Sequence, residues 1–99
     1  MEITPRHIEQ IQALYRYGSF RRAAEKLCIS QPALSRSILV LEEKLGVKFL
    51  DRAQGKLLPT PYGRMVLSRG GSILKEFEIL HRDINLLQNS EQGVLTIGC

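Results

Sequence analysis

Tryptophan is absent from this 99-residue sequence, and cysteine and histidine occur only twice each. The two cysteines, Cys28 and Cys99, neither form a disulfide framework nor show the spacing of metal ligands, so we expect a reducing compartment and no metal. No apolar run approaches the roughly 18 residues that a membrane-spanning helix needs, and no charged and then apolar leader opens the chain. These absences predict a cytoplasmic protein that is not attached to a membrane.

Residues that could carry catalysis are equally scarce. His7 and His81 lie on separate predicted helices without a carboxylate pattern nearby, so both are expected at the surface. The sequence has no Ser/His/Asp arrangement and no glycine-rich phosphate loop. Cys28 is expected to be a small buried residue rather than a redox switch. We therefore predict that the chain is not an enzyme and binds no cofactor; the alternative is an enzyme whose active site lies outside these residues.

The charge is distributed unevenly along the chain. The net charge is +4, and the excess lies in residues 1–60, where ten Lys and Arg face six Asp and Glu. Residues 61–99 carry four residues of each sign and are neutral. A basic first half favours a polyanion such as nucleic acid as the partner, and a merely solvated basic face is the alternative.

Three short helices are predicted before residue 47, each with its own boundary signals. Thr4-Pro5, Ser19 and Ser30 supply the N-caps. Gly18 and Gly46 are expected to end the first and third helices. The apolar residues that recur at helical spacing, and should face the core, are Ile8, Ile11, Leu14, Tyr15, Ala23, Ala24, Leu27, Leu34, Ile38, Leu41 and Leu45.

A small hairpin is predicted after the third helix. Residues 47–50 and 57–60 have the composition of two short strands, with Gly55 in the turn between them. Pro59 would keep the second strand at an edge of the sheet. Arg52 and Lys56 would then stand at the tip of the hairpin, where we expect them to contact DNA.

A long helix is predicted from Pro61 to about Asn89. At 1.5 Å per residue it would span on the order of 40 Å. From Ile73 onward its apolar residues are spaced 4, 3, 4 and 3 apart, which is the heptad pattern of a coiled-coil seam. Gly70-Gly71 interrupts the pattern at a cost of about 1 kcal/mol per glycine. A second copy of the chain should bury the seam; the alternative is a helix folded back on its own domain. The expected dimer interface comprises Val66, Ile73, Phe77, Leu80, Ile84 and Leu87.

The second and third helices are joined by the three-residue turn "CIS". Two helices that cross at a tight turn, followed by a hairpin, form a winged helix-turn-helix, whose second helix places its N-terminal residues in the DNA major groove. The expected fold class is therefore mainly α, with three helices, a two-stranded wing and a long dimerisation linker helix. On a helical wheel the polar start of the third helix lies roughly opposite its apolar stripe. The expected base-reading residues are Gln31, Pro32, Ser35 and Arg36.

Two carboxylates limit the expected contact with DNA. On the same wheel Glu42 and Glu43 fall on the polar side, where they would repel phosphates. Contact should therefore be confined to the first two turns, which Ser30 caps and whose free N–H groups favour a phosphate. Arg21 and Arg22 are further candidates for contact with the DNA backbone, with solvated charge as the alternative.

The run "SFRRAAEKLCISQPALSRSILVLEEKLGVKFLDR", followed by "LLPTPYG", resembles the DNA-binding region of the LysR-type transcriptional regulators. The shared features include the Ala-Ala pair, Ser-Gln-Pro-Ala-Leu-Ser, the Leu-Glu-x-x-Leu-Gly close and a wing arginine. The resemblance implies a winged helix-turn-helix in residues 1–60 and an antiparallel dimer through a linker helix in residues 61–90. It also implies that residues 91–99 begin a periplasmic-binding-protein-like domain for a small-molecule effector, and it leaves a tetramer of the longer protein open.

The resemblance assigns roles to individual positions and shows departures from the family pattern. The roles are base reading for Gln31, Pro32, Ser35 and Arg36, backbone or minor-groove contact for Arg52, capping and phosphate contact for Thr60, and capping for Ser30. Phe49-Leu50 reverses the usual Leu-Phe order, which predicts an exchange of the inward-facing side chain. Leu39 and Val40 replace residues that are usually polar or basic, so the alternative function is a protein-interaction module that docks through them. "GVLTIGC" is expected to be the first strand of the next domain.

Overall fold

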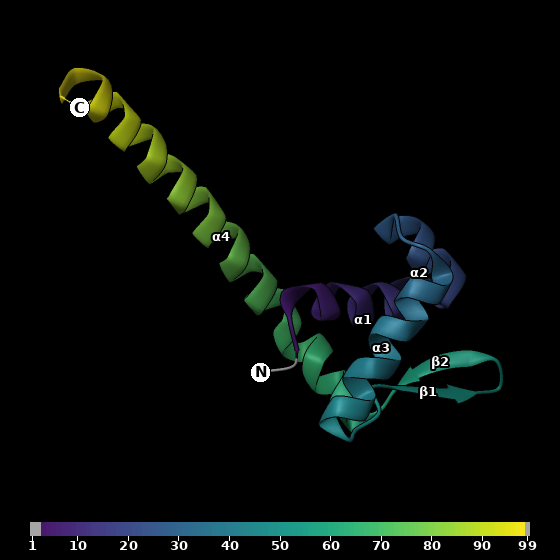
Figure 1. Ribbon diagram of the computed structural model, residues 1–99. Helices are drawn as coiled ribbons and strands as arrows, with labels where there is room; N and C mark the ends of the chain where they lie inside the picture. Colours follow the sequence, from purple (N-terminus) through teal and green to yellow (C-terminus); the bar gives the residue numbers. More distant parts are fainter. Residues whose placement is uncertain (1–2, 99) are drawn as a thin grey trace.

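The computed structural model describes residues 3–98, with the backbone alone for residues 91–98. Its elements in chain order are α1 (Pro5–Tyr17), α2 (Phe20–Leu27), α3 (Gln31–Leu45), β1 (Leu50–Ala53), β2 (Lys56–Pro59) and α4 (Pro61–Gly98). The first three helices and the two strands form one domain, from which α4 extends as a long arm (Figure 1). The predicted mainly helical fold, with a two-stranded wing and a long final helix, is confirmed.

The helix boundaries follow the local signals of the sequence. The Ser19 hydroxyl accepts a hydrogen bond from the backbone N–H of Arg22 at 3.1 Å, and the Ser30 hydroxyl accepts one from Ala33 at 3.2 Å. Gly18 and Gly46 end α1 and α3 with φ values of 77° and 69°, a left-handed conformation that glycine adopts without a steric penalty.

The start of α1 gives His7 a role that was not expected of it. The Thr4 hydroxyl accepts from the His7 backbone N–H, and the His7 Nδ1 atom accepts from the Thr4 backbone N–H at 3.0 Å, which closes a capping box. His7 is half-buried rather than a surface residue. Burial, and secondarily the positive charge of Lys44, lower its pKa.

The core lies where the three short helices meet. Ile11 and Leu14 from α1 and Leu34 and Leu41 from α3 are almost completely buried. Ala23 and Ala24 of α2 are buried as well, and their small side chains let α2 lie close to its neighbours. The remaining members of this cluster are Ala13, Ile38 and Phe49. The predicted inward-facing stripes of the three helices thus form the core, except that Leu45, at the last turn of α3, is 40% exposed and was wrongly expected to face inward.

The wing differs in its position from the prediction. The first strand begins at Leu50, whereas it was expected over residues 47–50, because both backbone groups of Phe49 bond to side chains of α1 and α3. The strands pair antiparallel with Leu50 opposite Pro59 and Ala53 opposite Lys56. Gln54 and Gly55, both with positive φ, form the two-residue turn.

The reversed pair Phe49-Leu50 places the aromatic side chain inward. Phe49 is 4% exposed and belongs to the core cluster, whereas Leu50 is half-buried at its edge. The alternation of side chains along an extended segment explains why the two neighbours point in opposite directions. The order found here therefore anchors the base of the wing with the larger of the two side chains.

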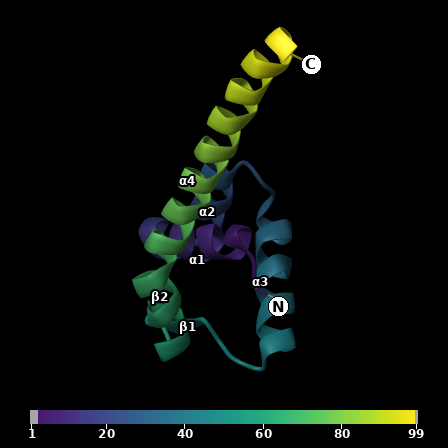
Figure 2. The same cartoon turned by 90° about the vertical axis from the view of Figure 1, so that its left-hand side faces the viewer.

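Glycine brings α4 close to the domain. A Cβ atom at Gly70 would lie 2.6 Å from Cγ2 of Ile8, so a larger residue where the helix crosses α1 would force a shift in the packing (Figure 2). Gly70 thus has a structural cause, whereas a Cβ atom at Gly71 would meet open space. Val66, which is expected in a dimer interface, is half-buried and packs against the core of its own domain.

The end of α4 also differs from the prediction. The helix was expected to stop near Asn89 and a strand to follow from Gly93, but the helix continues to Gly98. A strand needs a neighbour to satisfy its backbone groups, whereas a helix satisfies them within its own segment. Cys99 lies outside the described residues. Across the part of the chain that the structure describes, no helix combines the length and the apolar character needed to cross a membrane.

Candidate nucleic-acid interface

Helices α2 and α3 form the helix-turn-helix. Cys28 caps α2 in the left-handed conformation with φ 59°, and the Ile29 N–H bonds back to the Ala24 carbonyl at 3.0 Å. Ser30 then caps α3, so the turn is no longer than the sequence predicted. The expectation that Cys28 is buried is wrong: it is exposed, because the core is closed by Ala23 and Ala24 and the cap residue lies on the outside of the turn.

The start of α3 presents a polar surface. Gln31, Pro32, Ser35 and Arg36 are all exposed, while Leu34 on the opposite side is fully buried. In the part of the chain described, the side chains of Gln31, Ser35 and Arg36 show neither a hydrogen bond nor an ion pair to another residue, whereas Ser37 next to them is bonded to Gln10. The predicted base-reading groups therefore share one face and have their donors and acceptors available.

A hollow of about 270 Å³ joins this surface to the wing and to the start of α2. It is lined by Gly18, Ser19, Phe20, Arg21, Gln31, Arg52, Gly55, Lys56 and Leu57. The lining contains three cations and no carboxylate. The N-terminal end of α2 adds the positive end of the helix dipole at Ser19. Four residues that the sequence assigned to DNA contact, from four different elements, thus surround one site suited to an anion.

The wing arginine is held over an aromatic ring. The guanidinium carbon of Arg52 lies 5.4 Å from the centroid of the Phe20 ring, a cation–π distance that connects the wing to α2. Lys56 lines the same hollow from the second strand. The sequence predicted both residues at the hairpin tip but did not predict that the start of α2 would lie beside them.

The basic residues of α2 are divided between two environments. Arg21 lies 3.5 Å from Glu25, and both side chains are mostly exposed, so the pair adds little stability and leaves Arg21 able to exchange partners. Arg22 is exposed. Lys26 lies over the ring of Tyr17 at 5.7 Å. Among these basic residues of α2, Arg21 is the one that lines the hollow together with the wing.

Thr60 acts as a cap and as a tie between wing and linker. Its hydroxyl accepts the backbone N–H of Gly63 at 3.2 Å and donates to the Lys48 carbonyl. The predicted cap is therefore present. A hydroxyl has a single proton, so a hydrogen bond from Thr60 to a phosphate would have to replace the bond to Lys48.

Glu42 and Tyr15 were not recognised as polar contacts from the sequence. Glu42, which was expected on the polar side of α3 as a carboxylate that repels phosphates, accepts the Phe49 backbone N–H at 2.7 Å. The Tyr15 hydroxyl lies 2.5 Å from the Phe49 carbonyl oxygen and 3.1 Å from that of Leu58. Burial, together with the carboxylates of Glu42 and Asp51, raises the pKa of Tyr15 to about 12. The only signal in the sequence was that a tyrosine in an apolar stripe needs a partner for its hydroxyl.

A second unexpected contact joins α1 to the recognition helix. Gln10 is 4% exposed, and its side-chain oxygen accepts a hydrogen bond from the Ser37 hydroxyl at 2.6 Å. This bond satisfies a buried polar group and orients α3 about its own axis. Within the described residues no group of three or more His, Cys, Asp or Glu is placed to hold a metal ion.

The model of the bacterial regulatory helix-turn-helix proteins of the lysR family matches residues 5–64, from the start of α1 to the first turn of α4. The chain belongs to this family. It is 40% identical over 93 residues to the SDS degradation transcriptional activation protein of Pseudomonas sp. and 36% identical over 93 residues to the dual regulator OxyR of Escherichia coli. Both matches cover 94% of this chain and 30% of the relative, so the chain spans about a third of the length of the curated relatives it matches.

Solved structures of this family include complexes with DNA. The BenM_DBD/catB site 1 DNA complex has a TM-score of 0.79 and 32% identity, and the match covers 87% of this chain and 96% of that one. Vibrio fischeri DarR in complex with DNA has a TM-score of 0.80 and 27% identity, and the match covers 90% of this chain and 30% of DarR. The chain is thus the DNA-binding domain of a LysR-type transcriptional regulator, a family of regulators and not of enzymes.

Proposed function

We propose that this LysR-family domain binds double-stranded DNA as a homodimer and recognises an interrupted inverted repeat. The start of α3, exposed and polar on the side opposite its buried stripe, carries this proposal, since it is the end of a recognition helix that enters the major groove. Two copies related by a two-fold axis would present two such helices. The recognised site would then have the same symmetry.

The four exposed residues at the start of α3 suit different contacts with DNA because their side chains differ in chemistry. Gln31 offers the paired donor and acceptor that match adenine, and Arg36 the double donor that matches guanine or a phosphate. Ser35 can donate or accept, and Pro32 offers an apolar contact to a thymine methyl group. Their exposure supports these roles, since each side chain can approach a base without first breaking a bond within the described chain.

The DNA backbone would be held by residues around the basic hollow. Arg21, Arg52 and Lys56 line it, and Arg22 is exposed on the same helix as Arg21. The capped starts of α2 at Ser19 and of α3 at Ser30 add backbone dipoles that favour a phosphate. For Thr60, we propose phosphate contact only at the expense of its bond to the Lys48 carbonyl.

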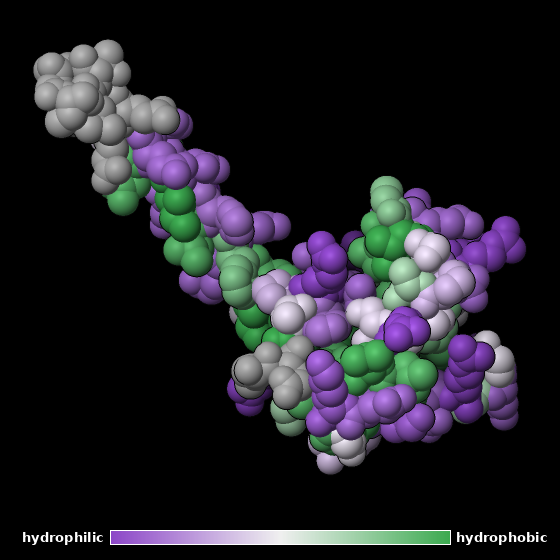
Figure 3. All heavy atoms as spheres, viewed as in Figure 1, coloured by the Kyte–Doolittle hydropathy of each residue, from purple (hydrophilic) through white to green (hydrophobic). Residues whose placement is uncertain are grey.

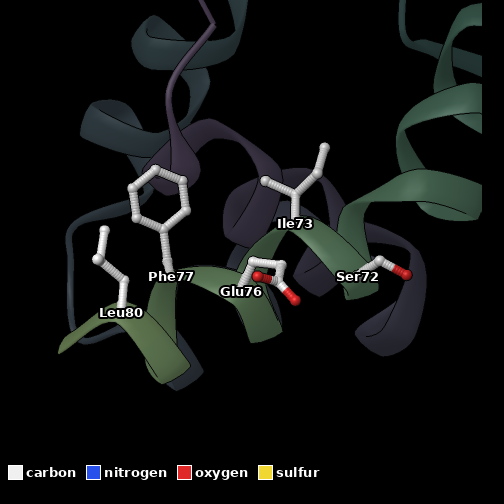
Figure 4. Close-up of a pocket in the computed structure, with 5 residues that line it drawn as sticks. All are labelled: Ser72, Ile73, Glu76, Phe77 and Leu80. Atoms are coloured by element: carbon white, nitrogen blue, oxygen red, sulfur yellow. The ribbon is translucent and has the colours of Figure 1, made fainter. Parts of the chain in front are cut away.

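The dimer would form through the exposed apolar stripe of α4 (Figure 3). Ile73, Phe77 and Leu80 project from the same side of the helix and line a groove together with Ser72 and Glu76 (Figure 4). The exposed fractions of these seam residues are 40% for Ile73, 41% for Phe77, 52% for Leu80, 46% for Ile84 and 61% for Leu87. A large apolar stripe left open to water favours association with a second copy. These exposed side chains do not support the alternative, in which the helix folds back onto its own domain.

The remaining parts of the proposal concern a longer protein. Because the chain spans about a third of its curated relatives, we propose that it is the N-terminal part of a cytoplasmic regulator whose remainder binds a small-molecule effector. Effector binding would then reach DNA through α4. Tetramer formation would belong to that longer protein.

The proposal is tested by selecting binding sites from random duplexes and footprinting the recovered sequences. We expect an enriched sequence with dyad symmetry, protected in two half-sites. Recovery of no enriched sequence would contradict sequence-specific binding, and an enriched single half-site would contradict the dimer. A metal chelator serves as a control and should have no effect.

A docking module for another protein is the second candidate. Leu39 and Val40 are 51% and 38% exposed on α3, and Leu39 lines a groove with Val47, Pro61 and Tyr62. Salt separates the two functions, because DNA binding should weaken by about 0.9 log units per phosphate contact for each decade of salt. Docking through apolar side chains would respond little to salt.

A further inference from the structure

Phe49 occupies the point at which the chain enters the wing, and both of its backbone groups are held. Its N–H donates to Glu42 Oε2 at 2.7 Å, and its carbonyl accepts from the Tyr15 hydroxyl at 2.5 Å and from the Thr60 N–H at 3.3 Å. Its side chain is 4% exposed in the core. Groups from α1, from α3 and from the residue that precedes α4 therefore converge on the backbone of one residue.

The same contacts reach the second strand of the wing. The Tyr15 hydroxyl also lies 3.1 Å from the carbonyl of Leu58 in β2, so it lies between this strand and the residue that precedes β1. The first turn of α4 packs against this place so closely that a Cβ atom at Gly63 would lie 2.9 Å from the Tyr15 hydroxyl oxygen. The base of the wing is thus fixed on three sides.

Beyond its base the wing has few further contacts. Residues 51–53 of β1 are exposed, half-buried Leu57 of β2 packs against the core, and the Arg52 guanidinium lies over the Phe20 ring. A two-stranded hairpin alone is marginally stable in water. The contacts at Phe49 therefore contribute much of what sets the direction of the wing, and Arg52 and Lys56 lie further along the hairpin.

We infer that Glu42 and Tyr15 are positioning residues that set the direction of the wing, and with it the contacts of Arg52 and Lys56 with the DNA backbone. The inference rests on the proposed DNA binding. It assigns to Glu42 a function opposite to the one that its charge suggests. A carboxylate near DNA repels phosphates, yet this carboxylate would increase affinity because it holds the wing in place.

The neighbouring residue Glu43 provides a matched comparison, because it is exposed and has the same charge. Each variant is measured as the full 99-residue chain on a selected site over a range of salt concentrations. For Glu43→Ala we expect unchanged or tighter binding. For Glu42→Ala we expect weaker binding and a shallower dependence of affinity on salt. The loss of two phosphate contacts would reduce the slope by roughly 1.8, which lowers the affinity by as much as roughly 60-fold at 0.1 M salt.

Three further measurements separate positioning from a general loss of structure. Glu42→Gln keeps an oxygen that can accept the Phe49 N–H and should restore both affinity and slope. In an Arg52→Ala background, Glu42→Ala should reduce DNA affinity by less than it does in the wild-type chain, because part of its effect acts through Arg52. The order of preference among single-base variants of the site should be unchanged, since α3 reads the bases.

Circular dichroism melting establishes that each variant is folded at the assay temperature. Should Glu42→Ala fail this control, Tyr15→Phe replaces it; this variant keeps the ring, loses only the hydroxyl, and should also give a shallower slope. The inference is overturned if both alanine variants bind more tightly, or if Glu42→Ala weakens binding at an unchanged slope. A wild-type chain that shows no salt-dependent binding would instead contradict the proposed function itself.

Discussion

The domain of residues 5–60 and the arm formed by α4 differ in how far their apolar side chains are buried. Within the domain most of the predicted apolar residues of α1, α2 and α3 are buried against one another. Along α4 the seam residues Ile73, Phe77, Leu80, Ile84 and Leu87 are all exposed. The charge follows the same division, since residues 1–60 hold the whole positive excess. One region is thus complete in a single chain, whereas the other presents an apolar surface that a second chain would cover.

The largest expected effect is on the seam of α4. Phe77→Asp should convert the dimer to a monomer, because each copy would lose an apolar burial worth about 1.5–3 kcal/mol, so the dimer loses about twice that. Analytical ultracentrifugation measures the dissociation constant. Leu86→Asp is the matched control, since Leu86 is 60% exposed but lies outside the seam, and it should remain a dimer. An unchanged mass for Phe77→Asp would show that α4 does not pair through this stripe.

The second effect concerns the domain alone. Arg36→Ala should cost about 1–3 kcal/mol on the preferred site and relax its specificity at one position, if Arg36 reads a base. Lys56→Ala should weaken binding to all sequences alike and reduce the salt slope by about 0.9. Fluorescence anisotropy on a set of single-base variants distinguishes the two patterns. Equal loss on every sequence for Arg36→Ala would make it a backbone contact.

The third expected effect concerns the two glycines at which α4 leaves the domain. Gly71→Ala should stabilise the protein by up to about 1 kcal/mol, because a Cβ atom there meets open space and alanine is the better helix former. Gly70→Ala should destabilise it instead, since its Cβ atom would overlap with Ile8. Urea unfolding gives both values. Equal effects of the two substitutions would mean that α4 does not pack on α1 at Gly70.

The smallest effect is on the pH dependence of stability. Because the pKa of His7 is lowered in the folded state, the unfolded chain binds the proton more readily, and stability falls as pH drops through about 6.5 toward the folded value. His7→Gln keeps an acceptor for the Thr4 N–H and should remove this part of the pH dependence. Unfolding free energies between pH 8 and pH 5 measure the difference. Identical pH profiles for the two proteins would refute the lowered pKa of His7.

Most of the fold was predictable because its signals are local. Caps at Thr4, Ser19 and Ser30 and stops at Gly18 and Gly46 act within one helical turn, and they are present as expected. The candidate site was predictable in part. The exposed polar start of α3 follows from helical periodicity, but the hollow it shares with Arg52 does not, because that depends on where the wing lies relative to α2.

The sequence by itself determined the helices, their inward faces and the charge of the domain, since each depends on neighbours a few positions away. Only the tertiary structure decided that Glu42 binds the backbone at the base of the wing, that Gly70 is a contact with α1, and that Val66 packs against the domain core. In each case the deciding partner lies outside the residue's own helix: Phe49 lies seven positions after Glu42 and beyond the end of α3, and α1 lies at the other end of the chain from α4. A helical wheel shows which side of a helix a residue occupies, but what covers that side depends on the packing of the other elements.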